Sequence, residues 1–91
     1  MQGFGWLDDL AKHMQITIVS PERTLYKGTA DAVKLPGGKG RFEVLHGHAP
    51  IISTLGEGVV ECIGAEPFSV AVRGGFVEVA RDEVSVCVEE Q

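Results

Sequence analysis

The sequence predicts an all-β domain, an antiparallel sandwich or barrel, because three features of the chain agree. Apolar and polar residues alternate with a period of two in most segments from Gln15 onward, as in half-buried strands. Glycine, proline and other turn residues interrupt these segments at short intervals. No helical crossover lies between them, so neighbouring strands are expected to pair in antiparallel fashion.

The turn residues divide the chain into short segments that are each interpreted as a strand with one buried face. In order, the expected turns are Ser20-Pro21, Gly28, Pro36-Gly37-Gly38, 47–50, 56–58, 64–67, Gly74-Gly75 and Arg81-Asp82. The alternation between them predicts a shared core, whose members are Ile16, Ile18, Val33, Leu35, Phe42, Val44, Val70, Val72, Val77, Val79, Val84 and Val86.

Length and charge restrict the class of protein. With 91 residues the chain has room for one small domain. Its 8 Lys plus Arg against 13 Asp plus Glu give a net charge of −5, which disfavours nucleic acid as a partner. No apolar run approaches the roughly 18 residues needed to cross a bilayer, and no signal peptide is evident. We therefore expect the chain to stay in the compartment where it is made.

The two cysteines, Cys62 and Cys87, are interpreted as free thiols, because nothing in the sequence indicates secretion. Alternation in 84–88 places the three valines on one face and Cys87 with Ser85 on the other. The Cys87 thiol is thus expected outside the main core.

A sharp corner near the middle of the chain is the most specific motif. In Gly47-His48-Ala49-Pro50 the glycine tolerates dihedrals closed to other residues, and the proline fixes its own φ and pushes Ala49 toward extended geometry. The turn should therefore present His48 in a defined direction. An apolar strand enters the corner, and Ile51-Ile52 leaves it.

This corner and an ordered set of weaker motifs resemble the sandwich domain of the epsilon subunit of rotary F-type ATP synthases. The resemblance extends from residue 15 to about residue 88 and implies a sandwich of two antiparallel sheets with about ten short strands. The motifs that accompany the corner are 16–22, 25–28, 32–37, 55–58 and 74–79.

The resemblance implies a non-catalytic rotor subunit that couples ion-driven rotation of the membrane c-ring to the gamma subunit and so to ATP synthesis. Its expected partners are the gamma subunit and the c-ring, at the cytoplasmic face of the bacterial inner membrane, peripheral through the complex. No cofactor, metal, nucleic acid or nucleotide binding is expected. The residues proposed to contact gamma or the ring are Lys39, Arg41, Phe42, Glu43, His46, His48, Ala49 and Pro50.

Two stretches near the chain ends differ from the family pattern. Family members commonly continue after the sandwich into a C-terminal helical hairpin, whereas this sequence ends at Glu89-Glu90-Gln91, as a natural short form or a truncated one. Residues 1–13 are interpreted as a leader or extension, possibly non-native, with the spacing of a short amphipathic helix at Phe4, Leu7 and Ala11. Residues 14–91 form the expected sandwich domain.

Several motifs have the residue types of known sites but a simpler structural interpretation. Gly37-Gly38-Lys39-Gly40 lacks the following Ser or Thr and the helix of a phosphate loop, so a hairpin turn is preferred. His46 and His48 have the spacing of two metal ligands, but the bend at Gly47 favours surface histidines. No arrangement of nucleophile and base suggests catalysis.

Arg73-Gly74-Gly75-Phe76 is better explained as a glycine bend between strands than as an RNA motif. Glu61, between Val59 and Ile63, was considered for a subunit contact.

The alternative function from another class is a free-standing sandwich that binds a carbohydrate or small ligand. Such a site needs a concave aromatic surface. The chain has one Trp, one Tyr and four Phe, several of them expected in the core, so few aromatic side chains remain to build it.

Overall fold

A computed structural model describes residues 13–91, and in this part of the chain all regular structure is β. The predicted leader, including Phe4, Leu7 and Ala11, lies outside the described residues apart from His13. Residues 13–91 contain no helix long and apolar enough to cross a membrane. The eight strands are β1 (Met14–Val19), β2 (Thr24–Ala30), β3 (Ala32–Gly37), β4 (Gly40–Leu45), β5 (Ile51–Leu55), β6 (Gly58–Ile63), β7 (Phe68–Ala80) and β8 (Glu83–Glu90).

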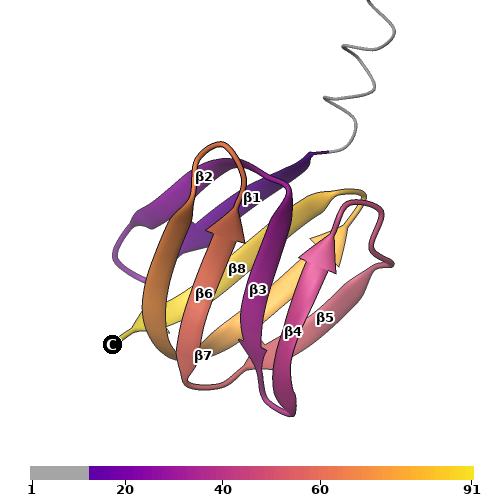
Figure 1. The fold of residues 1–91 in the computed structure, drawn as a ribbon. Helices are drawn as coiled ribbons and strands as arrows, with labels where there is room; N and C mark the ends of the chain where they lie inside the picture. Colours follow the sequence, from indigo (N-terminus) through magenta and orange to yellow (C-terminus); the bar gives the residue numbers. More distant parts are fainter. Residues whose placement is uncertain (1–12) are drawn as a thin grey trace, which may run out of the picture.

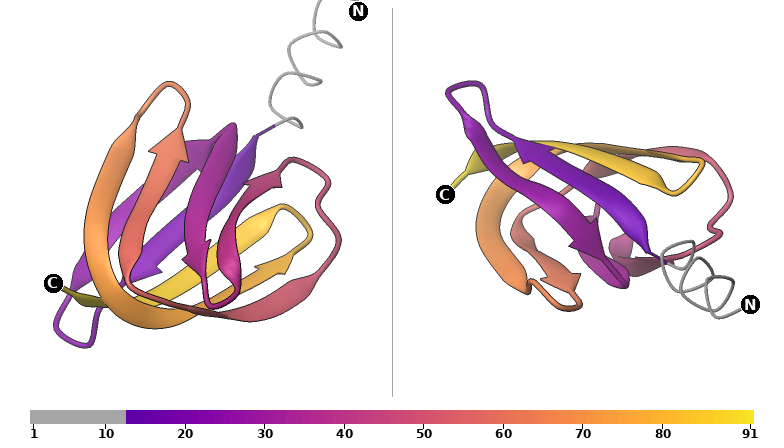
Figure 2. Two further views of the ribbon diagram at one scale, coloured as in Figure 1. Left: turned by 60° about the horizontal axis from the view of Figure 1, so that its bottom comes forward. Right: turned by 90° about the horizontal axis from the view of Figure 1, so that it is seen from above.

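The strands form two packed layers, so the predicted β-sandwich is confirmed (Figure 1). One layer has the order β5–β7–β8–β1–β2, and the other contains β4, β3, β6 and the first half of β7. All pairings are antiparallel except that between β1 and β8, which is parallel. Figure 2 shows how the long strand β7 curves from one layer into the other.

The strand count is lower than the roughly ten expected, because residues 13–91 contain eight strands. Gly74-Gly75 was expected to be a turn, but β7 runs through it for 13 residues with an irregularity between Val72 and Gly74. Gly28 was also expected in a turn and lies inside β2. At 74–75 the two glycines lie where the strand bends, and glycine within a strand often marks a bulge or bend.

The core lies between the two layers and largely matches the prediction. All the predicted members are buried except Phe42 and Val70, which are half-buried and pack against the core. Phe42 belongs to β4, a strand at the edge of its layer. The residues that the prediction omitted are Met14, Ala30, Ala32, Leu55, Val60, Cys62 and Val88.

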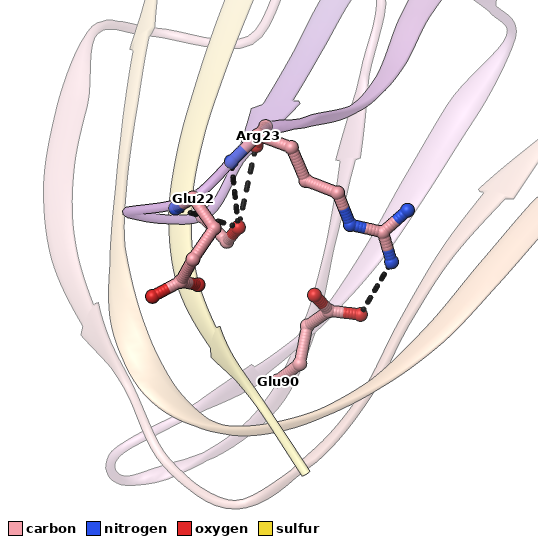
Figure 3. Close-up of polar contacts among 4 residues, drawn as sticks. Glu22, Arg23 and Glu90 are labelled. Carbon is pink, nitrogen blue, oxygen red and sulfur yellow. Dashed lines mark hydrogen bonds and ion pairs between the residues drawn. The ribbon is translucent and has the colours of Figure 1, made fainter.

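The β1–β2 turn is fixed by one hydroxyl group and one ion pair (Figure 3). The Ser20 hydroxyl accepts hydrogen bonds from the backbone N–H groups of Glu22 (3.3 Å) and Arg23 (3.2 Å). The Arg23 guanidinium lies 3.3 Å from a carboxylate oxygen of Glu90, near the end of β8. The ion pair links the turn to the neighbouring strand, but Arg23 is 66% exposed, so the pair contributes little to stability.

An aromatic pair links β2 with the start of β7. Tyr26 of β2 stacks on Phe68 of β7 with ring centroids 4.9 Å apart. The Tyr26 hydroxyl donates a hydrogen bond to the carbonyl oxygen of Glu66 at 3.0 Å. Desolvation of this hydroxyl raises the pKa of Tyr26, with smaller contributions from Cys62 and Glu66. The two rings join the layers, and because they stack on each other, these ring faces are not free to bind a ligand.

Candidate interaction surfaces

The outer face of the five-stranded layer carries an apolar row across three strands. Phe76 of β7 lies opposite Cys87 of β8, which in turn lies opposite Val19 of β1. Residues directly opposite each other in a sheet share a face, so these three side chains are neighbours. Phe76 is 50% exposed, and Ile52 on β5 is 76% exposed. The side chains that alternate with them point into the core, and the row faces away from it.

Two shallow hollows shape this face. The first, with a volume of about 370 Å³, lies around Phe76 and Cys87 and is bordered by Pro21 and Glu89. The second, about 360 Å³, lies along Pro50, Ile52 and Glu78. Among the described residues, Phe76 is the single aromatic side chain that lines the first hollow, and none lines the second. Such a face suits the side chains of a protein partner better than a sugar ring, which favours stacked aromatic residues.

The predicted contact residues do not form a single site, because they lie at the two ends of β4. Lys39 and Arg41 are at the β3–β4 turn, while His46 begins the β4–β5 corner. A strand of six residues extends roughly 20 Å, so the two groups are well separated. Figure 1 shows the turn and the corner at opposite ends of the sandwich. The predicted contact residues near the turn are Lys39, Arg41 and Phe42. Those in the corner are His46, His48, Ala49 and Pro50, and Glu43 is exposed on β4 between the two groups.

At the turn, Arg41 is held within the protein. Its guanidinium donates a hydrogen bond to the backbone carbonyl of Val59 at 2.9 Å and lies 3.4 Å from the Glu61 carboxylate. Glu61, which was predicted for a subunit contact, therefore has an internal partner on the outer face of β6. Lys39 is exposed at the tip of the turn, next to a hollow lined also by Ser53 and Thr54. Lys39 thus presents its charge more freely than Arg41.

The corner has the conformation that its sequence predicts. Gly47 has φ = 81°, which glycine adopts without strain. His48 is half-buried: its backbone N–H donates to the Leu45 carbonyl at 3.1 Å, and its Nδ1 lies 2.7 Å from the Ala49 carbonyl. The imidazole is therefore fixed against its own loop, and its position depends on how that loop is held.

Sequence reasoning missed the residue that holds this loop, Asp82 in the β7–β8 turn. One Asp82 carboxylate oxygen accepts the Gly47 backbone N–H at 2.7 Å, and the other lies 3.2 Å from His46 Nδ1. Asp82 and Gly47 are 35 positions apart. Only the pairing of β7 with both β5 and β8 brings the corner and this turn together.

Metal-ligating side chains and the two thiols were the remaining candidates for a chemical site. Residues 13–91 contain no group of three or more His, Cys, Asp or Glu side chains placed to hold a metal ion. Both cysteines are free thiols, and Cys87 lies on the outer face, as predicted. Cys62 is buried in the core, and desolvation raises its pKa to about 11. Its thiolate form is therefore suppressed at neutral pH.

The fold and its family define the class of protein. Residues 13–91 match the family described as the β-sandwich domain of the ATP synthase delta/epsilon chain. The chain belongs to this family.

Individual relatives agree with this assignment. The chain is 40% identical over 80 residues to a protein named ATP synthase epsilon chain from Leptospira borgpetersenii. The matched residues make up 87% of this chain and 63% of the relative. The chain is likewise 40% identical to the epsilon chain of Parvibaculum lavamentivorans over 82 residues, or 88% and 62% of the two chains. The chain therefore spans a little over three fifths of the length of these relatives.

Solved structures show the same fold at low sequence identity. A chain in the Euglena gracilis mitochondrial ATP synthase, in a structure of its OSCP, F1 and c-ring, matches with a TM-score of 0.80 and 19% identity, over 87% of this chain and 52% of that one. A chain in the central stalk and c-ring of Tetrahymena thermophila mitochondrial ATP synthase matches with a TM-score of 0.71 and 14% identity, over 85% and 63%.

Proposed function

We propose that this chain is the sandwich domain of a non-catalytic subunit in the central stalk of an F1Fo ATP synthase. In this role it links the gamma subunit to the membrane ring, so that rotation driven by ion flow reaches the catalytic head. The family assignment and the names of the relatives support the complex. The expected location is peripheral, at the cytoplasmic face of the bacterial inner membrane.

The observation that carries the proposal is the apolar row formed by Val19, Cys87 and Phe76. Ile52 is exposed on the same face but lies diagonally from Phe76, because Thr54 is the β5 residue opposite it. Rotor subunits transmit torque through stable contacts, and such contacts have an apolar core with a polar rim. Glu78 and Glu89 border the two hollows and supply such a rim. We assign this face, together with the corner at His48, to gamma.

The opposite end of the molecule is assigned to the ring. The β3–β4 turn with Lys39 lies beside the turn between β5 and β6, where the Gly56 N–H donates to the Pro36 carbonyl at 2.7 Å. These two turns form one end of the sandwich, away from the corner (Figure 1). Lys39 is exposed at this end, whereas Arg41 is paired with Glu61 and Glu57 is exposed in the β5–β6 turn, so the charges here do not select the sign of the ring surface.

Replacing His48 with alanine is expected to separate binding from stability. The contacts of His48 are local to the loop, so the free energy of unfolding should fall by less than about 1 kcal/mol. Affinity for the gamma subunit of the same synthase should fall about tenfold, as for an interface anchor. A melting curve and a binding isotherm measure the two quantities.

Lys39→Ala serves as the control, because Lys39 lies at the other end and should leave gamma binding unchanged. An unchanged affinity of the His48 variant removes this residue from the gamma interface. If the wild-type chain itself does not bind gamma, the proposed function is wrong.

A further inference from the structure

The two-residue turn between β7 and β8 has a costly backbone. Arg81 and Asp82 both have positive φ, 52° and 60°. Positive φ at both residues is the geometry of a type I′ hairpin turn, which Asn-Gly or Gly-Gly pairs adopt with much less strain. Residues with a side chain in this region carry a local penalty that other contacts must offset. Asp82 makes contacts of this kind.

Asp82 joins three separate parts of the sandwich. Its backbone carbonyl accepts the N–H of Gln15 at the start of β1, at 2.9 Å. Its two carboxylate oxygens contact Gly47 N–H and His46 Nδ1, at 2.7 and 3.2 Å. The Gly47 bond is at the short end of the range for a backbone donor and a charged acceptor, where such bonds are strongest. The corner is thus anchored at two consecutive residues directly before His48.

We propose that Asp82 is a positioning residue, whose carboxylate fixes the β4–β5 corner in the one conformation that presents His48 to the gamma subunit. This inference rests on the proposed function, because it takes the corner as part of the gamma contact. Without the carboxylate, Gly47 is free to sample the many dihedrals open to glycine, and the corner binds only after it has been ordered. That ordering lowers the apparent affinity.

Turn geometry and the contacts to the corner predict opposite effects of Asp82→Gly on the free energy of unfolding. Asp82→Gly relieves the backbone strain, so turn geometry alone predicts a more stable protein. The same change removes both contacts to the corner. Arg81→Gly is the matched control, because it relieves the same kind of strain in the same turn and leaves the carboxylate in place. Asp82→Asn retains an oxygen that accepts the Gly47 N–H but removes the charge.

The test is amide hydrogen exchange in the full chain, read at Gly47 and normalised to the core amide of Val86. In Asp82→Gly the normalised rate at Gly47 should rise about tenfold or more, as expected for loss of a hydrogen bond to a charged acceptor. In Arg81→Gly it should stay at the wild-type value, and in Asp82→Asn it should rise by less. Affinity for gamma should fall about tenfold in Asp82→Gly and remain unchanged in Arg81→Gly.

An unchanged rate at Gly47 in Asp82→Gly overturns the proposal, and so does an equal rise at Gly47 and Val86, which indicates a general loss of stability. Faster exchange at Gly47 with unchanged gamma affinity also overturns the proposal, because the order that Asp82 gives the corner would then not contribute to gamma binding. Absence of gamma binding by the wild-type chain refutes the proposed function itself, and it is distinguishable because the exchange data do not involve gamma.

Discussion

Replacing Gly75 with alanine is expected to lower the free energy of unfolding by about 3 kcal/mol or more, a large part of the stability of a small domain. Gly75 has φ = 147°, a region that side chains rarely adopt. A Cβ at this position would collide with the carbonyl oxygen of Cys87 and lie 2.9 Å from the Val88 Cα. Both obstacles are backbone atoms of the paired strand β8, so they cannot move aside cheaply.

Gly74→Ala is the matched control, since Gly74 is the preceding residue on the same strand. A Cβ there would lie 3.4 Å from its nearest neighbour, the Leu55 carbonyl oxygen. We expect a loss of no more than about 1 kcal/mol in this variant. Urea denaturation of both variants measures the difference. Equal losses would contradict the close approach of β7 and β8 at Gly75.

Replacing Phe76 with glutamate is expected to weaken gamma binding by about a hundredfold while the fold persists. Phe76 lies in the apolar row on the outer face and is half exposed, so a charge there remains hydrated in the free protein. In the complex the same charge would be buried against an apolar surface without a partner. A hundredfold change corresponds to about 2.7 kcal/mol of binding free energy, the size expected for a central contact residue. A binding isotherm measures it.

Val59→Glu tests whether the effect is specific to this face. Val59 is 41% exposed on β6, in the other layer of the sandwich. A glutamate there should leave gamma affinity within about threefold of the wild-type value. The reverse pattern, with Val59→Glu weakening binding and Phe76→Glu leaving it intact, would assign gamma to the opposite face.

The sequence predicts the core best where polar and apolar residues alternate strictly. In β8 the three valines are buried and Ser85 is exposed, as predicted. In β6 the prediction left out Val60 and Cys62, because both faces of that strand carry apolar residues and the alternation is ambiguous. Its pairing with β3 and β7 decides that these two are buried and that Val59 faces outward.

The interaction surfaces are harder to predict, because they depend on contacts between distant segments. The corner was found from its glycine and proline, yet Asp82, which anchors it, carries no local signal. Lys39 and His48 are close in sequence and lie at opposite ends of β4, because a strand separates its ends. The apolar row was missed because Val19, Phe76 and Cys87 come from three strands that only the sheet register aligns.

The central claim, that the outer face of the five-stranded layer binds gamma, can be tested with the two native cysteines. Cys87 is half-buried at the first hollow, whereas Cys62 is in the core with a pKa raised to about 11. Burial and the raised pKa both make the Cys62 thiol unreactive, so alkylation should proceed mainly at Cys87.

The decisive measurement is the alkylation rate of Cys87, followed by mass spectrometry of its peptide with and without saturating gamma subunit. We expect gamma to slow this reaction at least about tenfold, because a thiol covered in an interface is shielded from the reagent. A Cys87 rate that is the same in the presence of bound gamma would contradict the assignment of this face.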